Sequence, residues 1–426
     1  MKLFEPKILS SFKNYKANDY FSDIIAGVIV AIIALPLSIA LAIASGATPE
    51  RGLFTAIIAG FVTALLGGSK VNITGPTAAF ATIVAGIILT QGLDGLFLAT
   101  IMAGLILILM GVLRIGVLIK YIPHTITVGF TSGIAITLLI GQLKNFLGLT
   151  YPENTVDIET IDKLKHVFQN FSTVNIWSCV VGLIGLAILI VWPKISKKIP
   201  GSLIAVLVGS LVCLIPFITA DTIGSLYTIS SSLPTFSLPT VTLDKILALL
   251  PSAFTIALLA GIESLLSCKV SDKMIGDKHN SNTELIALGA GNVLVGFFGG
   301  IPATGAIART AANVKNGGKS PISGIIHAIV LLLVLVLLMP LASFIPMPIV
   351  ASILFIVAYN MSEWREFVSV IKTKKLSDIL VLVLTFLLTV IFDLVKAIAV
   401  GMVVHYAIVL IAYLIKKKKS KKETQQ

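Results

Sequence analysis

Long apolar segments follow one another along almost the whole chain, and short polar loops separate them. A helix needs about 20 predominantly apolar residues to cross a bilayer, and fourteen segments approach this length. They lie at 23–44, 52–68, 76–90, 95–113, 123–147, 175–192, 201–219, 246–268, 283–298, 303–314, 321–344, 347–360, 377–392 and 394–415. The sequence therefore predicts an all-α polytopic membrane protein with fourteen transmembrane segments.

Composition favours a bilayer over water as the surroundings of this chain. Hydrophobic residues make up 56% of the sequence and charged residues only 12%, whereas soluble domains are about 25% charged. A soluble protein with many buried strands would need frequent charged faces between its apolar runs, and the sequence lacks them. A lipid bilayer is therefore the expected partner of the apolar surface.

The net charge of +12 does not indicate a nucleic-acid partner. The basic residues lie in short loops rather than in a cluster with aromatic residues, which a nucleic-acid-binding face would need. Cys179, Cys213 and Cys268 show neither metal-binding nor redox spacing. We expect no metal ion and no cofactor.

Lysine and arginine are distributed unequally between alternate loops. With both termini in the cytoplasm, 25 of the 32 basic residues lie inside and 6 outside, and Arg309 alone lies in a span. This satisfies the positive-inside rule and predicts a multi-pass protein of the plasma membrane. A short surface helix is expected within 151–173. The predicted divisions are a cytoplasmic N-terminus (1–22), a first repeat (23–219), an extracellular linker (220–245), a second repeat (246–415) and a basic cytoplasmic tail (416–426).

Two of the predicted segments are short and interrupted by Gly and Pro. Segment 76–90 is entered through TGP at 74–76, and segment 303–314 through GGIP at 299–302. Each is the third of seven segments, which predicts a seven-plus-seven repeat. Because seven is odd, the second repeat is inverted in the membrane. Paired broken segments in corresponding positions indicate the substrate site of a transporter.

The two half-helices predict an anion site. A half-helix that starts within the membrane directs free backbone N–H groups and a partial positive charge towards the bilayer centre. Inverted symmetry makes two such N-termini face each other, and this arrangement suits an anion. Small side chains would let the ion approach the backbone. The expected binding residues here are Thr77, Ala78, Ala306, Ile307 and Ala308.

Two charged residues lie within predicted spans near this site. Arg309 falls in the first two turns of the second half-helix, where it is either a fixed cation for the anion or the partner of a carboxylate. Glu263 is a candidate coupling residue for a proton or sodium, or it forms a salt bridge with Arg309. Ser267 follows Glu263 by four residues, shares its helix face and is expected to contact the anion. His327 is expected to be a hydrogen-bonded packing residue.

Four stretches of the chain resemble the SulP (sulfate permease) family of anion transporters. They read ALPLS at 34–38, NITGPT at 72–77, IESLLS at 262–267 and GIPATGAIART at 300–310. The resemblance covers nearly all of 10–415. It implies a core domain made of segments one to four and eight to eleven, a gate domain made of the other six, and elevator-like transport. It also implies that the anion lies between segments three and ten, and it matches Glu263 and Arg309 to the family's acidic and arginine positions.

Two features depart from the usual family pattern. Family members usually carry a cytoplasmic STAS domain after the last span, whereas a short basic tail follows Ile415 here, so we expect the membrane domain alone. The sequence leaves open whether the protein forms a homodimer. The first span resembles the bicarbonate branch, which uses an Asp at the position of Glu263 and a Thr near Ile307 to hold sodium. Glu263, Ile307 and Arg309 therefore favour sulfate-type or proton-coupled transport at least as much as sodium coupling.

The expected function is secondary active transport of sulfate or bicarbonate, coupled through Glu263. A nucleobase transporter of the same fold would need polar and aromatic side chains where 303–312 is rich in alanine. An uncoupled channel or an exchanger is the other alternative, although an ionised Glu263 would repel the anion in a simple pore. No set of nucleophile, base and orienting residue indicates an enzyme.

The charge distribution makes a prediction about orientation. Reporter fusions at residue 420 and within 221–240 should report opposite sides of the membrane, because the positive-inside rule places the tail in the cytoplasm and the linker outside. Fusions within 269–278 should report the same side as residue 420. If the tail and the linker reported the same side, the arrangement of fourteen segments would be wrong.

Overall fold

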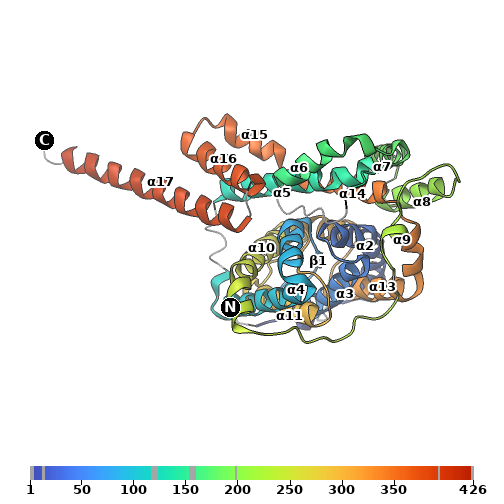
Figure 1. Ribbon diagram of the computed structural model, residues 1–426. Helices are drawn as coiled ribbons and strands as arrows, with labels where there is room; N and C mark the ends of the chain where they lie inside the picture. Colours follow the sequence, from blue (N-terminus) through green and yellow to red (C-terminus); the bar gives the residue numbers. More distant parts are fainter. Residues whose placement is uncertain are drawn as a thin grey trace.

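The computed structural model describes residues 4–11, 15–116, 123–152, 160–196, 199–391 and 394–423 (Figure 1). Helices dominate this part of the chain, as predicted, and two three-residue strands are the exception. Eight of the described helices are long and apolar enough to cross a membrane. Shorter apolar helices occur at Gly201–Cys213, Leu376–Ile391 and Ala399–Ile411. The count of fourteen spans therefore stays a prediction.

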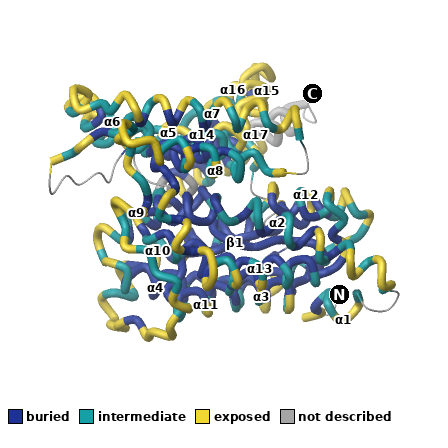
Figure 2. Tube along the Cα trace, turned by 90° about the vertical axis from the view of Figure 1, so that its right-hand side faces the viewer, coloured by how far each residue is buried: buried dark blue, intermediate teal, exposed yellow. Residues whose placement is uncertain are grey.

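The helices form two layers, which appear one above the other in Figures 1 and 2. The larger layer contains α2 (Ala17–Ala44), α3 (Pro49–Leu66), α4 (Ala81–Val112), α10 (Leu243–Ile275), α11 (Ser281–Phe297), α12 (Ile307–Lys315) and α13 (Pro321–Leu338). The smaller layer contains α5 (His124–Leu147), α7 (Ile176–Ile195), α8 (Gly201–Cys213), α14 (Met347–Met361), α16 (Leu376–Ile391) and α17 (Leu394–Glu423). This division has the same membership as the core and gate domains that the family resemblance implies.

Short elements connect and cover these layers. The surface helix expected within 151–173 is confirmed as α6 (Thr160–Gln169), whereas α15 (Trp364–Lys372) was not predicted. The other short elements are α1 (Lys7–Ser11), α9 (Ile223–Leu226) and the 3-10 helices η2 (Ala78–Phe80), η4 (Phe171–Thr173) and η5 (Met339–Phe344). The linker that contains α9 pairs with the connection between the layers, because Thr222 forms a β-bridge with Pro346.

Several helix ends differ from the predicted segments. The third and fourth segments form one element, α4, whose helical course is broken at Gly92 (φ 68°, ψ −174°). Glycine adopts this positive φ without steric cost, which explains why the break occurs there. Helix α2 begins within the predicted N-terminal segment, α10 begins within the predicted linker, and α17 continues into the basic tail. Apolar length alone did not predict these ends, because polar residues extend each helix beyond its apolar stretch.

The two broken segments meet in an antiparallel ribbon. Strand β1 (Thr74–Pro76) pairs with β2 (Ala303–Gly305), and Thr74 lies opposite Gly305. Side chains of the larger layer fix the second segment: Asn292 bonds both the N–H (2.8 Å) and the C=O (3.0 Å) of Ala303. Thr55 bonds the N–H and the C=O of Ile301, both at 2.8 Å. The ribbon was not predicted, because its backbone partner lies more than 200 residues away in the sequence.

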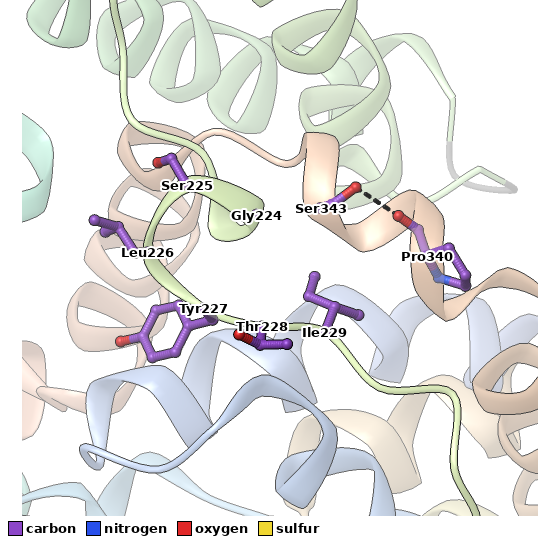
Figure 3. A pocket seen from close by; sticks show the side chains of 8 residues that line it. All are labelled: Gly224, Ser225, Leu226, Tyr227, Thr228, Ile229, Pro340 and Ser343. Carbon is purple, nitrogen blue, oxygen red and sulfur yellow. Dashed lines mark hydrogen bonds between the residues drawn. The ribbon is translucent and has the colours of Figure 1, made fainter.

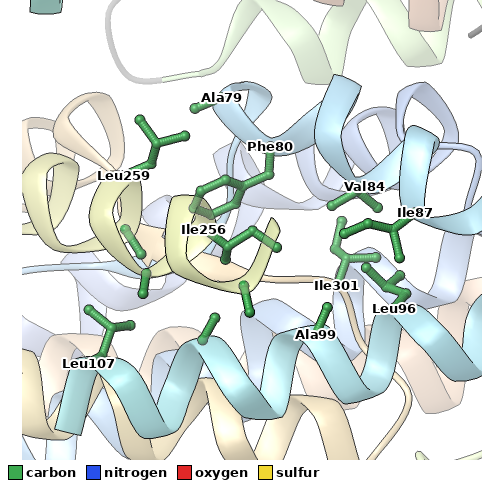
Figure 4. Packing of buried hydrophobic residues seen from close by; sticks show 14 of the residues in the cluster. Ala79, Phe80, Val84, Ile87, Leu96, Ala99, Leu107, Ile256, Leu259 and Ile301 are labelled. Carbon is green, nitrogen blue, oxygen red and sulfur yellow. The ribbon is translucent and has the colours of Figure 1, made fainter. Parts of the chain in front are cut away.

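Apolar packing fixes the half-helix that follows β1. Figure 4 shows side chains from both parts of α4 in one buried cluster with residues of α10. Its labelled members are Ala79, Phe80, Val84, Ile87, Leu96, Ala99, Leu107, Ile256, Leu259 and Ile301. Because protein interiors are close-packed, this cluster leaves the half-helix little freedom to shift.

A buried carboxylate connects α11 to the segment between α3 and β1. Glu284 is 1% exposed and accepts hydrogen bonds from the N–H of Gly68 (2.8 Å), the N–H of Ser69 (3.1 Å) and Nδ2 of Asn72 (2.7 Å). Glu284 lies in the first turn of α11, at the start of a predicted span, and the hydroxyl of Ser264 also donates to it at 3.4 Å. Several donors converge on Glu284, so its role here is to hold the entry to β1.

Removing this carboxylate should destabilise the protein. Glu284→Ala leaves the buried N–H groups of Gly68 and Ser69 without an acceptor, which costs about 1–3 kcal/mol each. We therefore expect a clearly lower melting temperature for the purified variant in detergent. Glu366→Ala is the matched control, because Glu366 lies on the exposed side of α15. Equal melting temperatures for the two variants would contradict the structural role of Glu284.

Candidate functional site

The ribbon sets the positions of two helix N-termini. Strand β1 leads through Thr77 into η2 and α4, and β2 leads through Ala306 into α12. Because the strands are antiparallel, the helices leave the ribbon at opposite ends and run away from each other. Both N-termini, which carry partial positive charge, are therefore adjacent to the ribbon. At a strand rise of about 3.3 Å per residue, three residues separate them by roughly 10 Å.

The first turn of α12 has no side-chain cap. Ala306 is its N-cap residue, and the described structure contains no cap hydrogen bond from its side chain. The N–H of Ala306 itself donates to the C=O of Ile73 at 2.8 Å. The first-turn N–H groups of a helix have no intrahelical acceptor. This end of the ribbon therefore presents backbone donors that a ligand could use.

The predicted binding residues divide into exposed and buried sets. Ile307 is 42% exposed, Ala308 is exposed, and Ala306 and Thr77 are partly exposed. Ala78 is 3% exposed. The 3-10 helix η2 also contacts α5 of the smaller layer. The predicted site therefore lies at the surface of the larger layer, near the boundary between the two layers.

Glu263 lies on α10 beside this site. Its side chain is partly exposed, and its carboxylate lies beside the side chain of Thr77. Glu263 forms no ion pair with Arg309 among the residues that the structure describes. The carboxylate whose charge acts on it is that of Glu363. Glu363 precedes α15 and has a left-handed backbone conformation (φ 46°). The sequence did not indicate Glu363, because no motif or spacing around this residue relates it to α10.

Ser267 points away from the exposed face. Its hydroxyl donates to Oδ1 of Asn72 at 2.7 Å, and it also lies 3.0 Å from Oγ1 of Thr310. Ser267 is completely buried. Residues four apart on a helix differ by about 40° in direction, which is enough here to direct Glu263 towards the layer boundary and Ser267 into the packing behind the ribbon. The anion contact expected of Ser267 is therefore not visible in this arrangement.

The side chain of Arg309 folds back over the ribbon. It is 1% exposed, and its NH2 group donates to the C=O of Pro76 at 3.3 Å. Gly75 permits this approach, because a Cβ atom built there would lie only 2.2 Å from NH1 of Arg309. The guanidinium thus reaches from α12 towards the start of η2, between the two helix N-termini. Arg309 takes part in none of the ion pairs found in the described ranges, so no carboxylate there neutralises it.

A hollow elsewhere in the protein lacks these features. Figure 3 shows a cavity of about 520 Å³ where α9 meets η5; its lining residues are Gly224, Ser225, Leu226, Tyr227, Thr228, Ile229, Pro340 and Ser343. It contains no charged side chain and none of the predicted site residues. Within the described part of the chain, no group of three or more His, Cys, Asp or Glu residues could hold a metal ion.

Comparison with known proteins decides the family. The model of the sulfate permease family matches residues 20–385. The chain belongs to the sulfate permease family. The resemblance that the sequence motifs indicated is therefore confirmed. The family and its relatives are transporters rather than enzymes.

Two relatives show the closeness of the match. YvdB of Bacillus subtilis (strain 168), provisionally named a sulfate transporter, is 45% identical over 397 residues, which are 93% of this chain and 74% of YvdB. The bicarbonate transporter BicA of Synechocystis sp. (strain ATCC 27184 / PCC 6803 / Kazusa) is 34% identical over 387 residues, which are 89% of this chain and 68% of BicA. Among transporters of this family, the chain is thus similar to proteins named for two different anions.

Solved structures share the architecture. The transmembrane domain of a cyanobacterial bicarbonate transporter, BicA, matches with a TM-score of 0.81 and 32% identity, over 90% of this chain and 98% of that chain. The murine Slc26a9 anion transporter in the inward-facing state matches with a TM-score of 0.88 over 96% of this chain and 71% of that chain. Its identity of 21% supports the fold alone. The protein is a membrane anion transporter of the sulfate permease family.

The contact between Gly75 and Arg309 can be tested directly. Gly75→Ala should displace the guanidinium from the ribbon and weaken anion binding roughly tenfold, the loss expected for a strained hydrogen bond to a charged group. Gly86→Ala is the matched control, because a Cβ atom there meets nothing within 4 Å. Isothermal titration of the purified proteins would measure both affinities. Equal affinities would exclude a role of the Gly75 contact in binding.

Proposed function

We propose that this member of the sulfate permease family carries sulfate or bicarbonate across the plasma membrane by secondary active transport. The anion would bind at the ribbon, between Thr77 and Ala78 on one side and residues 306–309 on the other. The observation that carries this proposal is the convergence of two helix N-termini and one buried guanidinium without a carboxylate partner. Such an arrangement attracts an anion and repels a cation.

The choice between the two anions rests on the relatives. The relative at 45% identity is named for sulfate, and the relative at 34% identity is named for bicarbonate. Alanine side chains flank the predicted site at 306 and 308 and supply no polar atoms. The ion would therefore be held by backbone N–H groups and one guanidinium, which suits a compact oxyanion. A nucleobase would need further polar side chains to satisfy its ring atoms.

We propose an elevator-like mechanism in which the larger layer moves against the smaller one. All of the candidate binding residues belong to the larger layer, and the exposed ones lie near the boundary between the layers. A rigid layer could then carry its site from one side of the membrane to the other. The antiparallel pairing of β1 with β2 is also what an inverted seven-plus-seven repeat would produce, and this supports fourteen segments with both termini in the cytoplasm.

Glu263 is the proposed coupling residue. Its carboxylate contacts Thr77, a residue of the proposed anion site, and it is partly exposed at the layer boundary. An anion and a nearby ionised carboxylate repel each other. Protonation of Glu263 would therefore strengthen anion binding, and anion binding would favour protonation of Glu263. The proton and the anion would then cross together. Sodium at the same carboxylate is the alternative form of coupling.

Uptake by proteoliposomes tests both the function and the coupling. Wild-type protein should accumulate radiolabelled sulfate or bicarbonate when a pH gradient is imposed. Glu263→Gln resembles the protonated acid, and it should bind the anion while losing the response to the pH gradient. Glu366→Gln, which changes an exposed acid on α15, should behave as wild type. A sodium gradient is applied in a separate series.

The outcomes separate the alternatives. If wild type accumulates neither anion, the proposed function is wrong. If it accumulates an anion but Glu263→Gln keeps the full response to both gradients, coupling does not pass through Glu263. An anion flux that no gradient can drive uphill would favour the uncoupled channel or exchanger. Loss of sodium-stimulated uptake alone in the variant would assign sodium to this carboxylate.

A further inference from the structure

Buried polar atoms without a hydrogen-bond partner gather on one side of the ribbon. In the described part of the chain, eleven buried side-chain nitrogen and oxygen atoms have no partner. Six of them belong to four residues, namely Ser38, Thr74, Arg309 and His327. Buried polar groups in native proteins are almost always satisfied, so a concentration of exceptions needs an explanation.

Helix α3 shows that these groups lie close together. A Cβ atom built on Gly60 would lie 3.3 Å from the C=O of Thr74 and 3.5 Å from Nδ1 of His327. One turn earlier on α3, the Cβ of Ala56 lies 3.6 Å from a Cβ built on Gly75, which in turn meets the guanidinium of Arg309. Small residues four apart on one face of α3 thus make room for the imidazole and the guanidinium side by side.

Ser38 lies at the far end of the same face of α3. A Cβ atom built on Gly52, one further turn along α3, would lie 2.0 Å from the backbone oxygen of Ser38. The residues Ser38, Arg309 and His327 therefore lie along one face of α3, over about 12 Å for eight residues of rise. The row runs behind the ribbon, on the side that packs against α3.

The unpartnered atoms are chemically complementary. Nε and NH1 of Arg309 are donors only, and NH2 already has an acceptor in Pro76. A neutral imidazole has one acceptor nitrogen, and a threonine hydroxyl has two acceptor lone pairs. Free donors therefore lie beside free acceptors. One bridging water or a small rotation of the guanidinium would join them, and the net gain would be that of a charge-assisted hydrogen bond.

Nearby acids do not compete for Arg309. On α2, Asp23 accepts hydrogen bonds from the N–H of Lys319 (2.6 Å) and from Ser320 (2.5 Å), so it is occupied at the start of α13. On α3, the charged residues are Glu50 and Arg51, both in its first turn. Helix α13 itself carries no acid or lysine between Pro321 and Leu338. The acceptors available to Arg309 behind the ribbon are thus neutral.

We propose that His327 is a positioning residue for Arg309. Its neutral imidazole accepts a hydrogen bond from the guanidinium, directly or through one water, and holds it between the two helix N-termini. A carboxylate at this place would fix the same geometry but would cancel the charge that attracts the anion. A neutral acceptor fixes the geometry and leaves the charge available. This inference rests on the proposed anion site and extends it to a residue that was expected only to pack.

Three substitutions of His327 separate the effect of a neutral acceptor from the effect of a negative charge at this position. His327→Gln keeps a neutral acceptor, His327→Leu removes it, and His327→Glu replaces it by a carboxylate. His405→Leu is the matched control, because His405 lies in α17 of the smaller layer. The full-length proteins are purified and reconstituted, and the affinities for sulfate and for bicarbonate are measured by titration, with KM and kcat of uptake measured alongside.

The expected results differ in direction. His327→Leu should weaken binding of the transported anion roughly 10- to 100-fold, the range for a lost hydrogen bond to a charged group, with KM affected more than kcat. His327→Gln should bind almost as well as wild type. His327→Glu should bind more weakly than His327→Leu although its melting temperature is no lower, because an Arg309–Glu pair forms. Unchanged binding by His327→Leu, or equal binding by the Gln and Glu variants, would overturn the proposal.

A second measurement does not depend on transport. Melting temperatures of wild type, Arg309→Ala, His327→Leu and the double variant form a cycle that detects coupling between the two side chains. Non-additive effects would support the contact even if neither anion bound, an outcome that would reject the proposed function alone. Additive effects would overturn the contact. If His327→Leu failed to fold, the comparison of the Gln and Glu variants, which differ chiefly in charge, would still decide the role of the neutral acceptor.

Discussion

The membrane interior supplies no water to backbone groups, and this constraint governs the centre of the protein. Two segments leave the helical conformation within the larger layer, and each must find partners for its exposed N–H and C=O groups. They satisfy each other through β1 and β2, while Thr55 satisfies Ile301 just before β2 and Asn292 satisfies Ala303, the first residue of β2. The helices that flank the ribbon begin where this pairing ends. The position of the Arg309 guanidinium, the exposure of residues 306–308 and the contact between Thr77 and Glu263 all follow from it.

The sequence predicted the parts of this centre that leave a local mark. Gly and Pro before residues 76 and 303 indicated the two breaks, and the rarity of charge in apolar spans singled out Glu263 and Arg309. The residues that hold the breaks in place were not predictable in the same way. Asn72 and Glu284 act on partners far away in the chain, and nothing in their neighbourhood distinguishes them from ordinary polar residues at helix ends. Ser267 shows the limit of helical periodicity, because a shared face with Glu263 did not give it the same surroundings.

Charge is distributed unequally between the back and the front of the ribbon. Behind it, Arg309 lies near an imidazole and small residues of α3. In front of it, Glu263 lies at the boundary with the smaller layer and experiences the charge of Glu363. The positive and negative groups are therefore held apart rather than paired. Separation of this kind costs stability, because a buried charge without a partner is expensive, and it suits a site in which a mobile ion supplies the missing charge.

The register of the ribbon has a geometric consequence for the proposed anion site. Because the two half-helices start where the strands end, the gap between their N-termini is fixed by a count of residues and not by the flexibility of side chains. Adding one residue to each strand would widen the gap by about 3.3 Å and would turn the following side chains to the opposite face. The length of the strands thus sets the distance between the two helix N-termini in steps of one residue. The size of ion that can contact both helix N-termini would then change in steps. Selectivity for ion size would therefore depend on the number of residues in the strands, which a single substitution does not change.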